Sequence, residues 1–159
     1  MRLTEIITPQ SIRTGWKPPK GGKAAIIRDL VGVLCQARGL DPEQREALEE
    51  AILAREAQKS TGIGKGVAVP HGKSDKVAGV CGVLAIADTG VEFAAADKQP
   101  VRYFVLMASD FHTSAEHVAA LAQITRVLQR ADVAKTLAGP ATPAEVHALL
   151  RKHEKTPVA

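Results

Sequence analysis

The chain has 159 residues, of which 45% are hydrophobic and 24% are charged, and this is the profile of one globular domain with a sizeable core. No segment approaches the roughly 18 consecutive apolar residues of a membrane-spanning helix, and Met1 to Gln10 lacks the layout of a signal peptide. We therefore expect a soluble, cytoplasmic protein. Cys35 and Cys81 stand far apart among apolar neighbours, which predicts buried thiols and excludes a disulfide framework or a CxxC site.

Much of the excess positive charge, which is +4 in total, lies near the N-terminus. Arg13, Lys17, Lys20 and Lys23 surround a segment rich in proline and glycine. Proteins that bind nucleic acid normally combine basic residues with stacking aromatic side chains. Aromatic residues make up only 3% of this chain, and Trp16 is the only one in the basic stretch. We interpret the charge as a feature for an anionic partner or for solubility and expect no nucleic acid partner.

The first 22 residues are predicted to form a basic arm outside the core. Leu3 to Thr8 fits either a short strand or a loose arm. Thr14 to Gly22 is predicted to be a loop because of its prolines and glycines. We expect a single domain over residues 1–159, with its structured core from about residue 23 to residue 150.

Two helices are predicted to follow in tandem. Apolar residues at helical spacing run from Lys23 to Arg38, and Gly39 is the residue type that often ends a helix. Asp41 followed by Pro42 is typical of a helix start, so the second helix is predicted to run from there to about Gln58.

The segment from Ser60 to Lys73 is the most unusual in the chain. Its glycines at alternate positions disfavour a helix and permit tight turns, and they are Gly62, Gly64 and Gly66. Val67 to Val69 is predicted to be a short buried strand that Pro70 ends. This places His71 on a loop just after a strand.

The remaining sequence predicts strands and then helices. Strands are expected over Val77 to Ala87, Val91 to Phe93 and Val101 to Met107. The spacings Thr113-Ser-Ala-Glu116 and Thr142-Pro-Ala-Glu145 predict capping boxes that open two helices, with a short helix from Asp132 to Ala138 between them. Elements in this order predict an α/β fold, most simply a three-layer α/β/α sandwich with a mixed central sheet.

Common nucleotide and metal motifs are missing from the sequence. The phosphate-binding GxxxxGK[ST] loop and the dinucleotide GxGxxG fingerprint both require glycine at position 67, where the chain has valine. No HExxH or GxSxG motif occurs, and the spacing of His112 and His117 does not place both on one helical face. We therefore expect neither a metal site nor an organic cofactor.

A histidine can act as a nucleophile without a separate base, because a neutral imidazole nitrogen can attack phosphorus directly. The transferred group then needs donors or positive charge around its oxygens. His71 is a candidate because it follows a strand and has Gly72 beside it, which leaves room for a partner. The amides of the Gly62–Gly66 loop and the helix N-terminus near Thr113 are candidate donors. The alternative is that His71 is a loop histidine without a role.

Several stretches carry a resemblance to a known family. They are Arg55-Glu56 with Ser60-Thr61-Gly62-Ile63-Gly64, then Val67-Ala68-Val69-Pro70-His71-Gly72, and Phe93-x-x-x-Asp97-x-x-Pro100-Val101 with the helix that contains His117. From about Lys23 to Leu150 the chain resembles the type-2 enzyme IIA domains of the bacterial phosphoenolpyruvate-dependent sugar phosphotransferase system. These form the fructose/mannitol class, which includes a nitrogen-regulatory branch. The basic stretch before Lys23 has no clear counterpart there.

The resemblance implies a phosphoryl relay. His71 matches the family histidine that accepts a phosphoryl group from the phosphohistidine of the carrier protein HPr, or of its nitrogen-branch counterpart. His117 matches a second histidine that stabilises this group, and Arg55 matches an arginine that stabilises charge. From the sequence alone, Arg55 is most simply a solvated helix end. The candidate phosphate-loop residues are Ser60, Thr61, Gly62, Gly64 and Gly72.

The resemblance also implies the partners. Family members pass the phosphoryl group to a IIB domain, or use their phosphorylation state to control a target protein, and they are at most peripheral to a membrane permease. No cofactor is implied. A non-catalytic regulatory module of the same fold, which binds proteins or anions, is the alternative.

Overall fold

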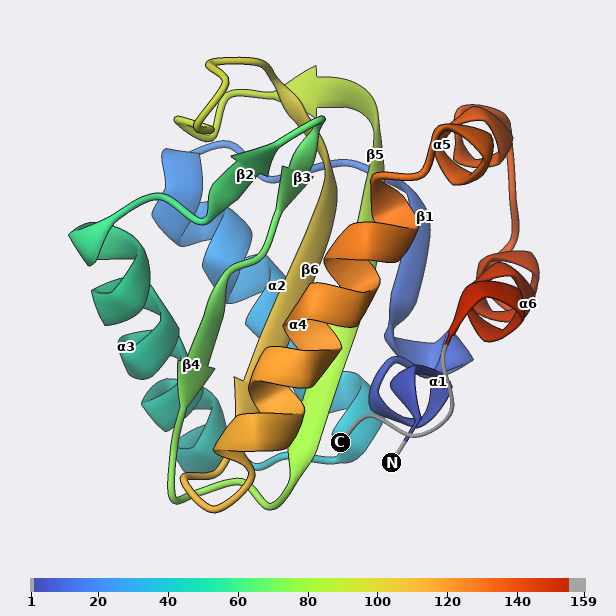
Figure 1. The fold of residues 1–159 in the computed structure, drawn as a ribbon. Coiled ribbons are helices and arrows are strands. Elements are labelled where there is room, and N and C mark those ends of the chain that lie inside the picture. Colours follow the sequence, from blue (N-terminus) through green and yellow to red (C-terminus); the bar gives the residue numbers. More distant parts are fainter. Residues whose placement is uncertain (1, 155–159) are drawn as a thin grey trace.

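The computed structural model describes residues 2–154, and these form a mixed six-stranded sheet between two layers of helices (Figure 1). The strands are β1 (Ile12–Trp16), β2 (Gly62–Gly64), β3 (Val67–Ala68), β4 (His71–Lys73), β5 (Val80–Val91) and β6 (Val101–Ser109). Their order is β1-β5-β6-β3-β2, and β4 also pairs with β6. The pairs β1·β5, β3·β6 and β4·β6 are parallel, whereas β5·β6 and β2·β3 are antiparallel.

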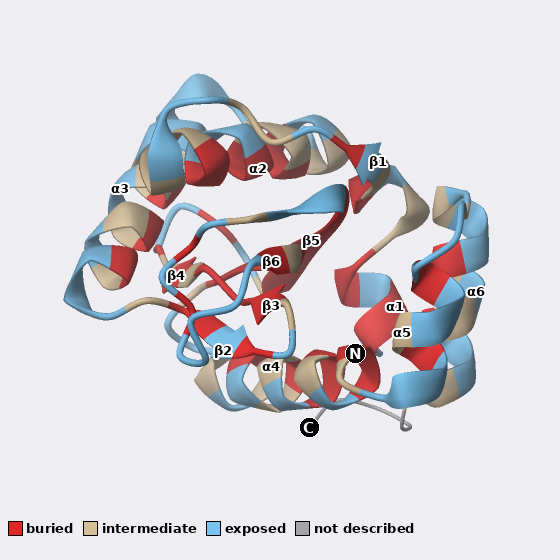
Figure 2. Ribbon diagram, turned by 90° about the horizontal axis from the view of Figure 1, so that it is seen from above, coloured by how far each residue is buried: buried red, intermediate tan, exposed pale blue. Residues whose placement is uncertain are grey.

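Helices cover both faces of the sheet (Figure 2). They are α1 (Leu3–Ile6), α2 (Gly22–Arg38), α3 (Pro42–Gln58), α4 (Ser114–Leu128), α5 (Ala131–Leu137) and α6 (Pro143–His153), with a 3₁₀ turn over Pro9–Ser11. The helices α2 and α3 pack on one face, and α1, α4 and α6 pack on the other. This arrangement confirms the predicted three-layer α/β/α sandwich with a mixed sheet.

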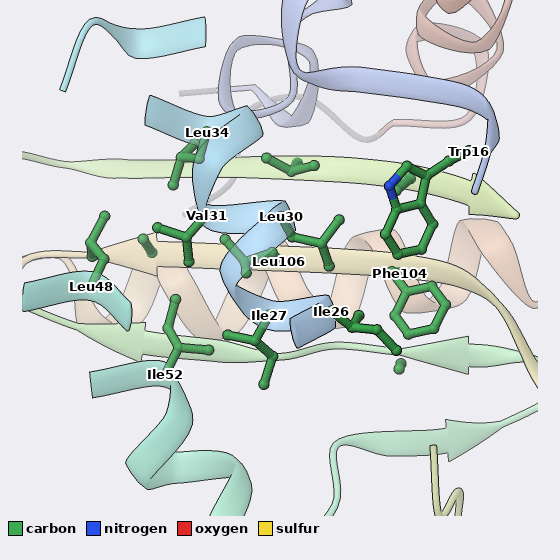
Figure 3. Packing of buried hydrophobic residues seen from close by; sticks show 14 of the residues in the cluster. Trp16, Ile26, Ile27, Leu30, Val31, Leu34, Leu48, Ile52, Phe104 and Leu106 are labelled. Carbon is green, nitrogen blue, oxygen red and sulfur yellow. The ribbon is translucent and has the colours of Figure 1, made fainter. Parts of the chain in front are cut away.

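Alternation along β6 divides the core between the two faces. Phe104 and Leu106 pack among the buried residues of α2 and α3 (Figure 3), while Val105 and Met107 pack against the α4 layer. This follows from the two-residue period of a strand, which sends successive side chains to opposite faces. Each fully buried leucine, isoleucine or phenylalanine contributes about 1.5–3 kcal/mol. Both cysteines are buried as predicted, and burial raises the pKa of Cys81 to about 11.

The tandem helices form where the sequence predicts them. Gly39 caps α2 in the left-handed conformation, with φ 66°, which glycine adopts at little cost. Asp41 opens α3 because its side chain accepts a hydrogen bond from the Gln44 amide at 2.8 Å. Thr142 caps α6 in the same way, so that predicted capping box is confirmed.

The expectation for the N-terminal segment is wrong. Residues 3–6 form a short helix rather than a strand or a loose arm, and Leu3, Ile6 and Ile7 are fully buried. Part of the predicted loop from Thr14 to Gly22 is also strand, because β1 pairs with β5 through Trp16. The core therefore begins near Leu3 instead of residue 23. The free energy gained by burying these three apolar side chains holds the segment in the core, although residues that favour turns follow it.

Trp16 belongs to this core. Its ring lies edge-on to Phe104, with centroids 5.3 Å apart (Figure 3), and its Nε1 donates to an Asp29 carboxylate oxygen at 2.9 Å. A buried indole satisfied in this way stabilises the fold and offers no surface on which a base could stack.

Two local predictions in the second half of the chain are also wrong. Instead of two strands at Val77–Ala87 and Val91–Phe93, the structure has one long strand, β5, which ends at Val91 and contains a register shift between Ile86 and Val91. The capping box expected at Thr113 does not form, because the Thr113 hydroxyl donates to Asp110 instead, at 2.8 Å. Asp110 also accepts the amides of His112 and Thr113 and thereby organises the turn before α4.

Candidate functional site

The short strand β4 places the candidate histidine against α4. His71 is the first residue of β4 and lies opposite Met107 of β6. The prediction that it lies on a loop is therefore wrong. Side chains in register on paired strands share a face of the sheet, and Met107 packs in the α4 layer. His71 and Lys73 are therefore on the α4 face, while Gly72 between them is on the α3 face.

The hydrogen bond of His71 fixes which ring nitrogen is free. Its Nδ1 lies 2.7 Å from the carbonyl oxygen of Val69, and because a carbonyl can only accept, Nδ1 carries the hydrogen. Nε2 then keeps its lone pair. Burial lowers the pKa of His71, the Val69 carbonyl opposes that shift, and the Arg55 charge adds to it. The ring is thus a neutral imidazole with a nucleophilic Nε2.

His117 lies beside His71 in α4. The two ring centroids are 5.5 Å apart, and His117 is only 2% exposed. Its Nδ1 lies 2.6 Å from the Ser109 hydroxyl oxygen, while its Nε2 has no hydrogen-bond partner among residues 2–154. We assign the hydroxyl as the donor, because a buried hydroxyl needs an acceptor. His117 then carries its hydrogen on Nε2, which makes this nitrogen a buried donor without an acceptor.

The pKa of His117 predicts how stability depends on pH. Burial, with the charges of His71 and Lys73, lowers this pKa from 6.5 to about 4. The unfolded chain therefore binds a proton below about pH 6.5 that the folded protein excludes until about pH 4. Stability from this residue is complete above about pH 6.5 and is lost as the pH falls toward 4, by an amount on the order of 3 kcal/mol.

We expect this pH-dependent loss of stability to appear in denaturant unfolding curves recorded between pH 7 and pH 4. The free energy of unfolding should fall less steeply in His117→Asn than in the unaltered protein. The same substitution at the exposed His112 is the control and should leave the curve unchanged. Parallel pH dependences in the two histidine variants would contradict the assignment of a neutral buried His117.

Arg55 approaches from the opposite layer. It lies in the last turn of α3, and its Nη1 donates to the Lys59 carbonyl at 2.9 Å, so it caps the end of its own helix. Its charge nevertheless contributes to the lowered pKa of His71. Arg55 is partly buried rather than a fully solvated helix end.

The neighbouring Glu56 ties the loop before β2 to α3. Its carboxylate is buried, accepts the Thr61 amide at 2.9 Å and the Thr61 hydroxyl at 2.5 Å, and pairs with the Lys23 ammonium at 2.9 Å. Ser60 likewise donates its hydroxyl to the Phe93 carbonyl at 2.8 Å. The hydroxyls of Ser60 and Thr61 thus have protein partners that fix the loop. Their predicted part in binding phosphate stays a prediction.

The glycine turn lies away from the two histidines. Gly64 pairs with Val67, which is opposite Tyr103 on β6, whereas His71 is opposite Met107. Four residues along a strand correspond to about 13 Å.

The turn's amides also have acceptors. The Gly62 amide donates to the Ser60 hydroxyl at 3.1 Å, and the Lys65 amide donates to Asp97 at 3.0 Å. The expectation that the Gly62–Gly66 amides cradle a group on His71 therefore finds no support in the geometry.

Gly72 is required by packing. A methyl group at this position would meet Ile52 Cγ1 at 2.9 Å, the Ile52 amide nitrogen at 3.1 Å and the Ala51 carbonyl carbon at 3.2 Å. Two of these atoms are backbone, so β4 could accept a side chain only by moving away from α3. Gly72 therefore permits the close approach that positions His71.

We expect Gly72→Ala to lower the free energy of unfolding by about 1–3 kcal/mol, the usual effect of overpacking. Gly139→Ala is the matched control, because Gly139 is exposed and its nearest neighbour would be 3.9 Å away. The control should stay within about 0.5 kcal/mol of the original chain. Urea unfolding at pH 7.5 measures both, and equal stabilities would contradict a packing role for Gly72.

Some residues of this site were not predicted from sequence. Lys73 lies on the face of His71, and its Nζ donates to the Ser114 hydroxyl at 2.9 Å. The turn before Ser114 is fixed by Asp110, whose pKa is lowered to about 2 mainly by the Gly79 amide and then by the Thr113 hydroxyl. The two-residue spacing of His71 and Lys73 would have revealed their shared face if the sequence had indicated a strand there.

Within residues 2–154 no group of three or more His, Cys, Asp or Glu side chains is placed to hold a metal ion. Over the same residues, none of the helices combines the length and the apolar character needed to span a membrane.

The chain is similar to known proteins over most of its length. The family described as "Phosphoenolpyruvate-dependent sugar phosphotransferase system, EIIA 2" matches residues 7–153. The PTS system fructose-specific EIIABC component of Bacillus subtilis is 30% identical over 155 residues, which cover 98% of this chain and 24% of that protein. The chain thus spans about a quarter of that relative.

Solved structures show the same fold. Nitrogen regulatory protein IIA-Ntr from Neisseria meningitidis matches with a TM-score of 0.81 and 25% identity, covering 93% of this chain and 98% of that one. The complex of mannitol enzyme IIA with phosphorylated mannitol enzyme IIB from Escherichia coli matches with a TM-score of 0.73 and 26% identity, covering 90% of this chain and 95% of that one.

Proposed function

Because this chain belongs to the EIIA 2 family of the phosphoenolpyruvate-dependent sugar phosphotransferase system, we propose that it is a phosphoryl relay whose acceptor is Nε2 of His71. One observation carries the proposal. The Nδ1 of His71 is occupied by the Val69 carbonyl, and the ring lies 5.5 Å from that of His117, whose buried Nε2 has no partner in the described chain. A nucleophile and an unused donor are thus side by side.

The transfer needs no proton to be moved beforehand. The lone pair of His71 Nε2 attacks the phosphorus of a phosphohistidine on the carrier protein, and the new P–N bond forms as the carrier's P–N bond breaks. The electron pair of the broken bond stays with the carrier's ring nitrogen. The positive charge that develops on the His71 ring is stabilised by the Val69 carbonyl, which accepts from Nδ1 at 2.7 Å.

His117 and Arg55 are proposed to stabilise the transferred group. The Nε2 of His117 would donate to a phosphoryl oxygen, and the Ser109 hydroxyl, which lies 2.6 Å from Nδ1, would hold the ring in the tautomer that this needs. Arg55 would act from the α3 side. Its Nη1 donates to the Lys59 carbonyl, and its other guanidinium hydrogens have no acceptor within residues 2–154. Gly72 contributes by allowing β4 to lie close to α3.

The surface beside the site suits a protein partner. Phe111 precedes α4 and is 62% exposed, and Val118 follows His117 and is 64% exposed. Exposed large apolar side chains next to a reactive group favour contact with another protein. The proposed partners are HPr or its nitrogen-branch counterpart as donor and a IIB domain as acceptor, and the proposed place of action is the cytoplasm.

The test is reconstitution with phosphoenolpyruvate, enzyme I and the carrier protein. Intact-mass spectrometry under non-acidic conditions, which preserve phosphohistidine, should show the gain of one phosphoryl group. Omitting the carrier is the control and should prevent the gain. The absence of any gain with a cognate carrier would contradict the relay and favour a non-catalytic module that binds proteins or anions.

Control of a target protein through the phosphorylation state is the second candidate. The similarity to a nitrogen regulatory protein over 93% of this chain favours it, whereas the similarity to a IIA that was solved with phosphorylated IIB favours onward transfer. Adding a IIB domain to the isolated phosphoprotein separates the two. Rapid loss of the phosphoryl group to IIB supports transfer, and its retention supports regulation.

A further inference from the structure

Lys73 is a cation on the face of the sheet where the two histidines meet. It follows His71 by two residues in β4, so both side chains are on the α4 side of the sheet. Its Nζ donates to the hydroxyl of Ser114 at 2.9 Å. Ser114 is the first residue of α4 and precedes His117 by three residues, which places both on the same side of the helix.

The Lys73 ammonium has no carboxylate partner within residues 2–154. Two other lysines differ in this respect, because Lys23 pairs with Glu56 and Lys76 pairs with Glu43. Lys73 is partly buried, and a partly buried ammonium bonded to one neutral hydroxyl retains two donors for an anion. The amides in the first turn of α4 add positive potential at the same place.

We propose that Lys73 is a catalytic residue of the relay: its ammonium contacts an oxygen of the phosphoryl group on His71, with the Ser114 hydroxyl as its positioning partner. The inference rests on the proposed function and adds a residue to it. No bond to Lys73 forms or breaks, and its proton stays on Nζ throughout. Its contribution is electrostatic, as is most of catalysis in phosphoryl transfer.

A formal positive charge is needed here because the two histidine rings that meet on this face are neutral. His117 can donate a hydrogen bond but is uncharged near pH 7, since its pKa is about 4. Arg55 lies in the α3 layer and caps its own helix. Lys73 already acts on both rings, because its charge contributes to the lowered pKa of His71 and of His117. The same field stabilises a dianionic phosphoryl group at Nε2.

The test compares Lys73→Met, Lys73→Arg and Ser114→Ala with Lys76→Met as the matched control. Lys76 is exposed and near Lys73 in sequence, and it pairs with Glu43 at the surface. The rate of phosphoryl gain from the carrier is measured by rapid quench and intact mass. We expect a rate about 10- to 100-fold lower in Lys73→Met, a loss of a few-fold in Ser114→Ala, and an unchanged rate in Lys76→Met. Lys73→Arg keeps the charge, so its rate should be higher than that of Lys73→Met.

A ³¹P titration of the phosphorylated proteins separates charge from structure. Loss of a contacting cation favours the protonated phosphoryl group, so the titration midpoint should move to higher pH in Lys73→Met and remain unchanged in Lys76→Met. A wild-type rate in Lys73→Met, or a slow rate with an unchanged midpoint, would overturn the assignment while leaving the relay intact. If the unsubstituted protein accepts no phosphoryl group, the relay and the role of Lys73 both fail.

Discussion

We expect the His71→Ala variant to accept no phosphoryl group from the carrier, because it would lack the nucleophilic nitrogen of the proposed transfer. We do not expect His117 to replace it. The Nδ1 of His117 is bonded to Ser109, and its ring is 2% exposed, so an incoming phosphorus atom cannot reach it in the same geometry. Rapid mixing with phosphorylated carrier, followed by intact-mass spectrometry, should show a gain only in the unsubstituted protein.

Two controls accompany this variant. His112→Ala removes an exposed histidine next to the start of α4 and should be phosphorylated normally. A denaturant unfolding curve shows that His71→Ala is folded, which matters because the variant loses the hydrogen bond to Val69. Full phosphorylation of folded His71→Ala would refute His71 as the acceptor.

The His117→Ala variant is expected to accept the phosphoryl group about 100- to 1,000-fold more slowly. This is the usual effect of removing one donor that faces the charge of a transition state. The substitution also leaves the buried Ser109 hydroxyl without its acceptor. Because the nucleophile remains, the final extent of phosphorylation should approach that of the original protein.

Rapid quench with intact-mass detection gives this rate, and the decay of the isolated phosphoprotein at pH 8 gives its lifetime. Ser109→Ala is the companion variant. It keeps the His117 ring but removes the hydroxyl that fixes its tautomer, so its rate of phosphorylation should fall between the rates of His117→Ala and of the unsubstituted protein. A His117→Ala rate within a factor of two of the unsubstituted protein would contradict the proposed donor role.

Most of the helices could be predicted because their signals are local. Asp41 and Thr142 form capping interactions within three residues of themselves, and Gly39 adopts a positive φ at the end of α2. Such features depend little on the rest of the chain. The capping box at Thr113 failed because Asp110, outside the motif, takes up the threonine hydroxyl.

The N-terminal segment could not be predicted because its structure depends on distant partners. The four residues of α1 are too few to form a stable helix alone, and they are ordered by burial against α4 and α6. β1 likewise consists of only five residues with an internal glycine. It is a strand because it pairs with β5, whose residues lie about 70 positions later.

The site was predicted unevenly for the same reason. The motif around His71 identifies the family, but the contact between His71 and His117 exists only because β4 pairs with β6. Placing His71 on a loop concealed the shared face of His71 and Lys73. The bonds of Ser109 to His117 and of Lys73 to Ser114 join separate elements, and no spacing in the sequence indicates them.

The most direct test of the account is the site of phosphorylation on the ring. Protein with ¹⁵N-labelled histidine, phosphorylated through the carrier, is studied by ³¹P and ¹H–¹⁵N NMR at pH 8. The account predicts a phosphoryl group on Nε2 of His71, with Nδ1 still protonated and bonded to the Val69 carbonyl. A phosphoryl group on Nδ1 of His71, or on His117, would contradict it.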